Sequence, residues 1–130
     1  MSLAVPGDPP HDPPALCEVV VTADDPEWLA DFTRALVDDR LVACGQVVTS
    51  VRSTYRWQGA VEEATEARVT LHTRVELVAA IVERAARSHP YDVPCVLALP
   101  ILGGNPDYLA WVEQETQGPR AAPGGGPSST

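Results

Sequence analysis

The chain contains no lysine, and its basic residues and cysteines are few. Its nine basic residues are all arginine and form no run, while 18 acidic residues give a formal net charge of -9 at pH 7. Proteins that bind nucleic acid or anionic membranes usually carry a basic patch or stripe. The composition therefore predicts neither nucleic acid nor a membrane surface as a partner.

Cysteines are few as well, and their spacing excludes two kinds of site. There are three cysteines, at Cys17, Cys44 and Cys95. They lie far apart and form no C-x-x-C pair, so neither a zinc clamp nor a disulfide framework is indicated.

No apolar run of the sequence approaches the roughly 20 residues of a membrane-spanning helix. The chain does not begin with a basic segment followed by an apolar stretch. We therefore expect a cytoplasmic protein.

The two ends of the chain are rich in proline and glycine. Residues 1–14 hold five of the 13 prolines, and residues 117–130 hold three more together with four of the nine glycines. Such segments bury too little apolar surface to offset the entropy lost on ordering. We therefore expect disordered tails at 1–14 and 117–130 around one folded domain at 15–116.

The first half of that domain indicates a strand, a helix and a long hairpin. Residues 18–22 are rich in valine and predict a buried strand. Asp24-Asp25-Pro26 is typical of a helix start, with aspartate as the cap and proline in the first turn. Residues 41–57 and 60–73 predict two long strands, the first half-exposed and bent, around a tight turn at Gln58-Gly59.

The second half indicates a helix, a strand and a shorter helix. Thr73-Arg74-Val75-Glu76 fits a capping box and predicts a helix start there. Residues 95–101 are an apolar run and predict a buried strand, and Asn105-Pro106 predicts a helix that runs to about Glu115. The first of these helices has an apolar stripe made of Val75, Val78, Ala79, Val82 and Ala86.

The first six elements follow the order β-α-β-β-α-β. This order is typical of the ferredoxin-like α+β fold, an antiparallel sheet with two helices on one face, here extended by a C-terminal helix. The hairpin arms are much longer than the usual strand of about five or six residues. Because arms of this length overhang a small domain and leave pairing edges open, we expect an oligomer.

Five segments stand in this order along the chain: RLVACG from Arg40, YRWQG from Tyr55, HTRVEL from His72, HPYDVP from His89 and GNPDYLAW from Gly104. In sequence and order they resemble the CutA family of divalent-cation tolerance proteins. The resemblance runs from about Val19 to Thr116 and implies a ferredoxin-like fold and a tight homotrimer, with hairpins pairing between subunits much as in PII signalling proteins. It also implies a link to tolerance of copper and other divalent ions, with no settled enzymatic activity.

The resemblance makes His89 the first candidate metal ligand. Some members carry a cysteine where Val21 stands and two histidines where Ser88-His89 stand, so of the copper ligands proposed for those members only His89 is present. Cys44, which matches a family cysteine, and Cys95 are candidate sulfur ligands for a soft metal. The alternatives are structural roles, with His89 bonding the last helix carbonyls and both cysteines acting as small buried residues.

The aromatic residues are expected either to pack or to line a pocket. The oligomer interface is predicted at Tyr55, Trp57 and Trp111, because aromatic side chains dominate buried interfaces. A pocket between subunits for a small ligand is predicted from Trp57, Arg68, Tyr91 and Asp92.

The resulting hypothesis is a cytoplasmic homotrimer that binds or buffers copper or another divalent cation, or responds to it. We expect no enzymatic activity and no organic cofactor. One alternative is a PII-like module whose clefts bind a small anionic ligand through arginines such as Arg52, Arg56 or Arg68. Others are a structural trimer without a tight ligand, and an enzyme that uses Cys44 or Cys95 as a nucleophile.

Overall fold

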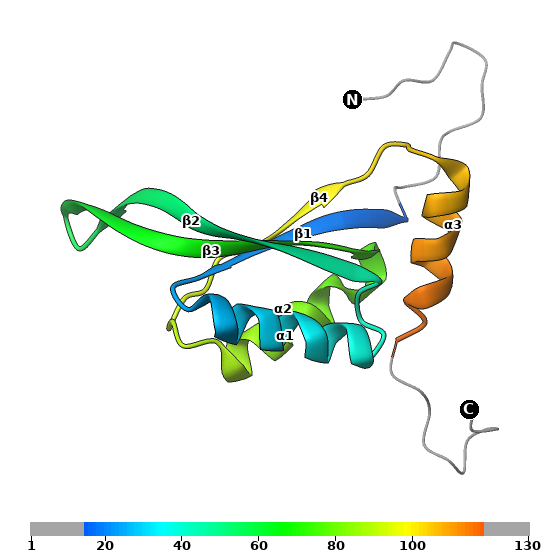
Figure 1. Cartoon of the computed structure of the whole chain (residues 1–130), viewed down its shortest axis with the longest axis horizontal. Coiled ribbons are helices and arrows are strands. Elements are labelled where there is room, and N and C mark those ends of the chain that lie inside the picture. The colour runs from blue at the N-terminus through cyan, green and yellow to red at the C-terminus, as the bar shows by residue number, and fades with distance from the viewer. Residues whose placement is uncertain (1–14, 119–130) are drawn as a thin grey trace.

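The computed structural model describes residues 15–118, which form one antiparallel sheet with helices on one face (Figure 1). The sheet order is β2-β3-β1-β4. Helices α1 and α2 lie side by side under the sheet, and α3 lies at one end. This confirms the expected ferredoxin-like α+β fold with a C-terminal helix. The elements are β1 (Leu16–Ala23), α1 (Pro26–Asp38), β2 (Cys44–Trp57), β3 (Ala60–Arg74), the short 3-10 helix η1 (Val75–Leu77), α2 (Val78–Ser88), β4 (Val96–Pro100) and α3 (Pro106–Glu115).

The predicted tails fall almost wholly outside the described residues. Residues 1–14 and 119–130 are not described, so disorder there stays a prediction. Within the described part, the Gly118 amide donates to the Arg40 carbonyl at 3.1 Å. The chain is therefore held against the domain just after α3.

The core lies between the sheet and the two helices because the strand residues alternate in direction. In β1, Val19 and Val21 are fully buried, whereas Glu18, Val20 and Thr22 on the opposite face are partly exposed. Helix α1 starts as expected, with the Asp25 carboxylate accepting from the Glu27 amide at 2.9 Å. The buried helix residues that meet the sheet include Leu29, Phe32, Leu36, Ile81 and Ala85.

The long hairpin extends well beyond the rest of the sheet, as the sequence predicted. Strand β3 pairs with β1 only over residues 67–74, so residues 60–66 pair with β2 alone. The turn residues Gln58 and Gly59 have φ values of 49° and 82°, and positive φ at both positions is what a two-residue hairpin turn requires. A bulge between Val48 and Val51 bends β2, with Ser50 at a φ of 61°.

The predicted start of α2 is wrong. Thr73 is not a helix cap but the penultimate residue of β3, where its hydroxyl donates to the Leu41 carbonyl. The helix begins only at Val78, after the 3-10 turn, and no side chain caps it. The predicted apolar stripe also differs from the face of α2 that is buried. Val75 and Val82 are 45% exposed, and the buried residues of α2 are Ile81 and Ala85.

The strand after α2 is shorter and more exposed than predicted. Strand β4 is an edge strand paired with β1, and Leu97 and Leu99 are 59% and 47% exposed. They lie opposite Val20 and Glu18, on the face that α1 and α2 do not cover. Cys95, expected to be a core residue, lies just before this strand and is exposed as well. In residues 15–118, no helix is long and apolar enough to cross a membrane.

Candidate functional site

His89, the first candidate metal ligand, has both ring nitrogens engaged inside the protein. It follows α2 and is 8% exposed. Because a carbonyl oxygen only accepts, Nε2–H donates to the Thr22 carbonyl at 2.7 Å, and Nδ1 accepts from the Tyr91 amide at 3.0 Å. The ring also packs against Trp28, with 4.7 Å between ring centroids. A metal ion could bind His89 only by displacing one of these hydrogen bonds.

Cys44 lies in another part of the sheet and cannot share an ion with His89. It pairs with His72 of β3, which pairs with Glu18 of β1. The His89 ring bonds to Thr22, four residues along β1 from Glu18 and therefore about 13 Å away. Residues 15–118 contain no group of three or more histidine, cysteine, aspartate or glutamate side chains that could hold a metal ion. The expected ligand set of His89, Cys44 and Cys95 is therefore not assembled.

Cys44 instead belongs to a cluster of four polar side chains, the Cys44–His72 cluster, made of Glu18, Cys44, His72 and Tyr108. Its first three members form one row across β2, β3 and β1, and Tyr108 reaches them from α3. The His72 ring lies between the other groups, with Nε2 2.9 Å from Glu18 Oε2 and Nδ1 2.6 Å from the Tyr108 hydroxyl. The Cys44 sulfur lies 3.3 Å from that hydroxyl and 3.7 Å from His72 Nδ1.

The Glu18 carboxylate accepts from His72 Nε2, because a carboxylate has no proton to donate. The Tyr108 hydroxyl and the Cys44 thiol share a hydrogen bond in which either group can donate. Burial and this bond to Cys44 raise the pKa of Tyr108 to about 12, so it stays a phenol at neutral pH. Of these residues, the sequence pattern indicated only Cys44 as a candidate ligand, and neither His72 nor Glu18.

A cavity of about 610 Å³ lies at the other end of the sheet, between the hairpin and the loop after α2. Three of the residues expected to line a pocket do line it, namely Trp57, Tyr91 and Asp92, but Arg68 does not. Among the described residues, none of those lining it is basic. The lining residues are Thr22, Ser53, Tyr55, Trp57, Glu66, Tyr91, Asp92, Val93 and Cys95.

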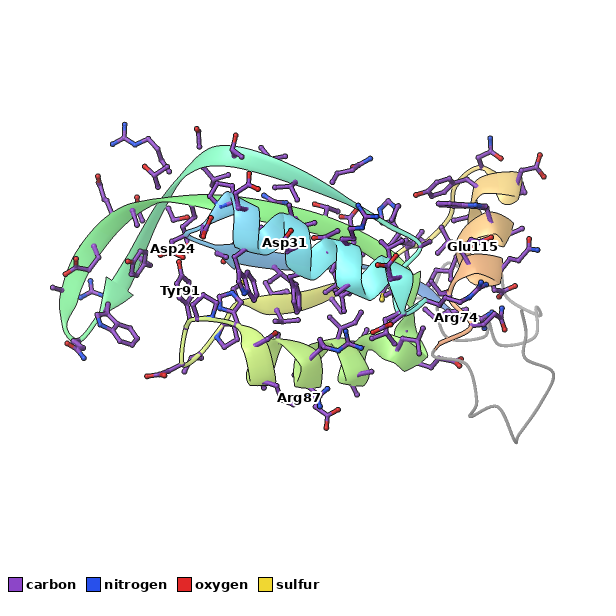
Figure 2. All side chains as sticks on the ribbon, turned by 60° about the horizontal axis from the view of Figure 1, so that its bottom comes forward. Asp24, Asp31, Arg74, Arg87, Tyr91 and Glu115 are labelled. Carbon is purple, nitrogen blue, oxygen red and sulfur yellow. The ribbon has the colours of Figure 1, made fainter. Side chains whose placement is uncertain are left out.

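Tyr91 anchors the loop that forms one wall of this cavity. It lies near Asp24, where α1 begins (Figure 2). Its hydroxyl donates to Glu66 Oε2 at 2.8 Å, which ties the loop to β3. Burial and the bond to this carboxylate raise the pKa of the Tyr91 hydroxyl well above its usual value. Tyr91 therefore lines the cavity as a neutral, hydrogen-bonded phenol and not as an ionised ligand.

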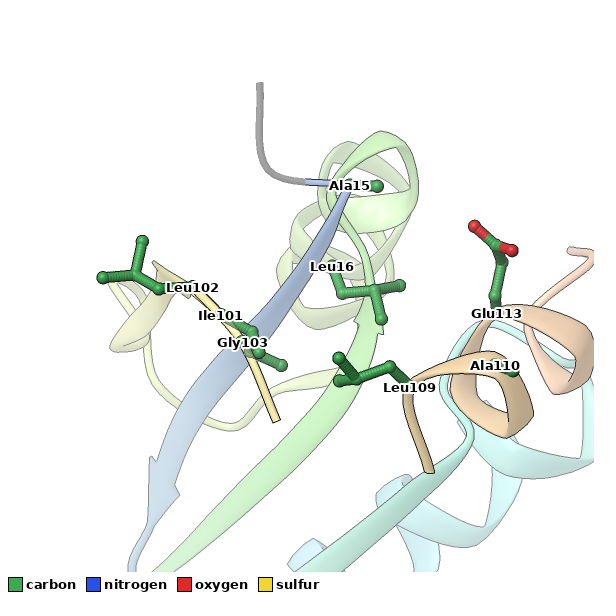
Figure 3. A pocket seen from close by; sticks show the side chains of 8 residues that line it. All are labelled: Ala15, Leu16, Ile101, Leu102, Gly103, Leu109, Ala110 and Glu113. Carbon is green, nitrogen blue, oxygen red and sulfur yellow. The ribbon is translucent and has the colours of Figure 1, made fainter. Parts of the chain in front are cut away.

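The remaining cysteine and a second hollow offer no candidate site. Burial raises the pKa of the Cys17 thiol, so it stays protonated in the core. A hollow of about 330 Å³ lies between the end of β4 and α3 (Figure 3), and among the described residues that line it only Glu113 carries a metal-ligating group. Its other lining residues are Ala15, Leu16, Ile101, Leu102, Gly103, Leu109 and Ala110.

A four-stranded sheet in this order, with two helices on one face and a projecting hairpin, defines a small ferredoxin-like protein with unpaired sheet edges. A family model described as "CutA1 divalent ion tolerance protein" matches residues 17–115. The chain belongs to this family.

Similar proteins share the CutA name. A divalent-cation tolerance protein CutA of Thermus thermophilus is 39% identical over 98 residues, covering 75% of this chain and 95% of that protein. Protein CutA of the mouse is 36% identical over 121 residues, covering 85% of this chain and 68% of that protein. The solved structure of the divalent cation tolerance protein from Thermus thermophilus has a TM-score of 0.76 at 38% identity, covering 78% of this chain and 98% of that one.

Proposed function

We propose that this chain acts in the cytoplasm as a homotrimer that binds or buffers divalent metal ions, copper among them, in support of cation tolerance. Family membership supports the link to divalent ions. The observation that carries the proposal is the acidic cavity at the base of the hairpin, which two carboxylates and a thiol line and to which the described residues contribute no basic side chain. These groups attract cations but are not a preassembled set of ligands.

The chemistry of that cavity favours a cation. Glu66 and Asp92 supply oxygen donors and negative charge, and Cys95 supplies a sulfur. The alternative of a small anionic ligand held by arginine finds no support here, because Arg68 lies outside the lining. A cation held by these groups would keep part of its water shell, because one thiol and two carboxylates do not complete a tetrahedral or octahedral set.

Assembly is supported by the surfaces that the monomer leaves open. Both β2 and β4 are edges of the sheet, and unpaired strand edges invite pairing with another chain. The sheet face without helices exposes the apolar residues Val48, Leu97 and Leu99. Trp57, predicted at an interface, is 54% exposed near the hairpin turn. A second and third copy would cover these surfaces and close the open side of the cavity.

The test is a calorimetric titration with Zn(II) and Cu(II), together with the mass in solution by light scattering. We expect three chains per particle and saturable binding that Asp92→Asn with Cys95→Ser weakens at least about tenfold. The matched control is Glu62→Gln, which removes one exposed hairpin carboxylate outside the cavity. Equal losses in the control and the cavity variant would mean that the acidic surface only attracts cations loosely. A monomeric mass at micromolar concentration would refute the assembly.

A further inference from the structure

We infer that the cavity at the base of the hairpin also binds an organic ammonium ion, that is, a protonated amine with an apolar body. The inference goes beyond the proposed function, because it concerns an organic ligand and does not depend on metal binding, although both concern the same cavity. Its basis is the set of three aromatic side chains and two carboxylates that line one space of about 610 Å³, namely Tyr55, Trp57, Tyr91, Glu66 and Asp92.

Alternation along the hairpin keeps its arginines away from this cavity. Successive residues of a strand point to opposite faces, and Tyr55 and Trp57 of β2 share one face and line the cavity. Arg52 and Arg56 alternate with them and therefore lie on the opposite face. There the Arg52 guanidinium pairs with the Glu63 carboxylate at 3.5 Å. The register of the hairpin thus disfavours an anion as the ligand and favours a cation.

The two carboxylates in the lining define the charge of the ligand. Glu66 is held at the cavity wall, because its Oε2 accepts from the Tyr91 hydroxyl at 2.8 Å, and a carboxylate can accept further hydrogen bonds. Asp92 adds a second negative charge from the loop after α2. Groups that only accept require a ligand with N–H donors. An alkyl amine, with a pKa near the lysine value of about 10.4, supplies these donors and a positive charge at neutral pH.

The aromatic residues favour an organic ion over a bare metal ion. Tyr55 and Trp57 are both exposed, so their rings have surface available to a ligand. Aromatic side chains offer apolar contact to the body of an organic ion and attract its ammonium group. A metal ion instead needs a set of oxygen, nitrogen or sulfur ligands at fixed distances, and no group of three or more such side chains is assembled within residues 15–118.

The size and rigidity of the cavity suit a small organic molecule. Its volume of about 610 Å³ lies within the range of about 300–1,000 Å³ that is usual for ligand pockets. The loop wall is fixed by a row of packed rings, in which His89 lies with its centroid 4.7 Å from that of Tyr91 and 4.7 Å from that of Trp28. A wall that is ordered before binding lowers the entropy lost when the ligand binds.

The experiment is a calorimetric titration of the full chain in its native assembly with phenethylammonium at fixed ionic strength. The neutral and anionic counterparts, phenethyl alcohol and hydrocinnamate, are titrated in parallel. We expect the ammonium ion to bind saturably and at least about tenfold more tightly than the alcohol, and hydrocinnamate not to bind. Asp92→Asn should weaken ammonium binding by about three- to tenfold. The matched control is Glu63→Gln, which removes a carboxylate from the opposite face of the hairpin and should change the affinity by less than about twofold.

The aromatic contact is tested on the unmodified chain, so the result does not depend on how a variant folds or assembles. In nuclear magnetic resonance spectra, bound phenethylammonium should show nuclear Overhauser contacts to the rings of Tyr55 or Trp57. Saturable binding without contacts to either ring would place the ligand elsewhere and overturn the inference.

The outcomes separate this inference from the proposed function. Saturable binding of Zn(II) or Cu(II) without binding of phenethylammonium would overturn the inference alone. Binding of phenethylammonium without binding of either metal ion would support the inference and refute the proposed function. Equal affinities for the ammonium ion and the alcohol, or equal losses in Asp92→Asn and Glu63→Gln, would also overturn the inference, because the cavity carboxylates would then not recognise the ammonium group.

Discussion

Gly45 lies where β2 packs against α1, next to Cys44 but facing the core, and replacing it by alanine should destabilise the fold. An alanine Cβ there would lie 2.5 Å from Thr33 Cγ2 and 2.8 Å from Leu71 Cδ2. Ordinary carbon contacts are about 3.5–4.0 Å. The Thr33 methyl cannot swing away freely, because its hydroxyl donates to the Leu29 carbonyl at 2.8 Å inside the helix.

The size of the effect follows from two opposing terms. Overpacking a core costs about 1–3 kcal/mol, while replacing glycine by alanine returns about 0.4–1 kcal/mol through the unfolded chain. We therefore expect Gly45→Ala to lower the free energy of unfolding by about 1–2 kcal/mol. For a domain of about 100 residues, the melting temperature should fall by roughly 5–15 °C.

The assay is thermal and urea unfolding followed by circular dichroism at one fixed protein concentration, because assembly makes stability concentration-dependent. Gly103→Ala is the control, since a Cβ there meets nothing within 4 Å, and it should change stability by less than about 0.5 kcal/mol. Adding Thr33→Ser, which removes the clashing methyl and keeps the hydroxyl, should recover part of the loss. A Gly45→Ala protein as stable as the unmodified chain would refute the packing described for α1 and β2.

Three further predictions test other parts of the structure. His89→Ala should lower the free energy of unfolding by about 1–3 kcal/mol, because it leaves the Thr22 carbonyl without its hydrogen-bond donor. The variant should keep the Zn(II) and Cu(I) affinities of the unmodified chain, and a loss of affinity in the folded variant would restore His89 as a ligand. The pKa of Tyr91 is raised, so its stabilising contribution is full below the ordinary tyrosine pKa of about 10 and is lost as pH rises toward the pKa in the folded state. Tyr91→Phe should flatten the alkaline decline of the free energy of unfolding measured by urea titration, and an unchanged decline would contradict this prediction. Trp57→Ala should shift light-scattering masses toward the monomer on dilution if the exposed ring is an interface anchor, and an unchanged mass would remove Trp57 from the interface.

The order of elements could be predicted from the sequence because local signals agreed with the fold. Asp25 and Asn105 cap α1 and α3 as expected, and Gln58-Gly59 forms the turn. The start of α2 could not be predicted in the same way. The Thr73 hydroxyl donates a hydrogen bond to the carbonyl of Leu41, which is 32 residues away in the sequence. This long-range hydrogen bond overrides the local four-residue capping pattern.

The Cys44–His72 cluster shows why a site built across strands is harder to predict. Near the turn, Trp57 pairs with Ala60, and continuing that register would place Cys44 opposite Thr73. The bulge between Val48 and Val51 shifts the pairing by one residue, so Cys44 meets His72 instead. A one-residue shift exchanges which side chains stand together on a face. The residues that surround Cys44 therefore depend on a bulge that composition and alternation do not locate.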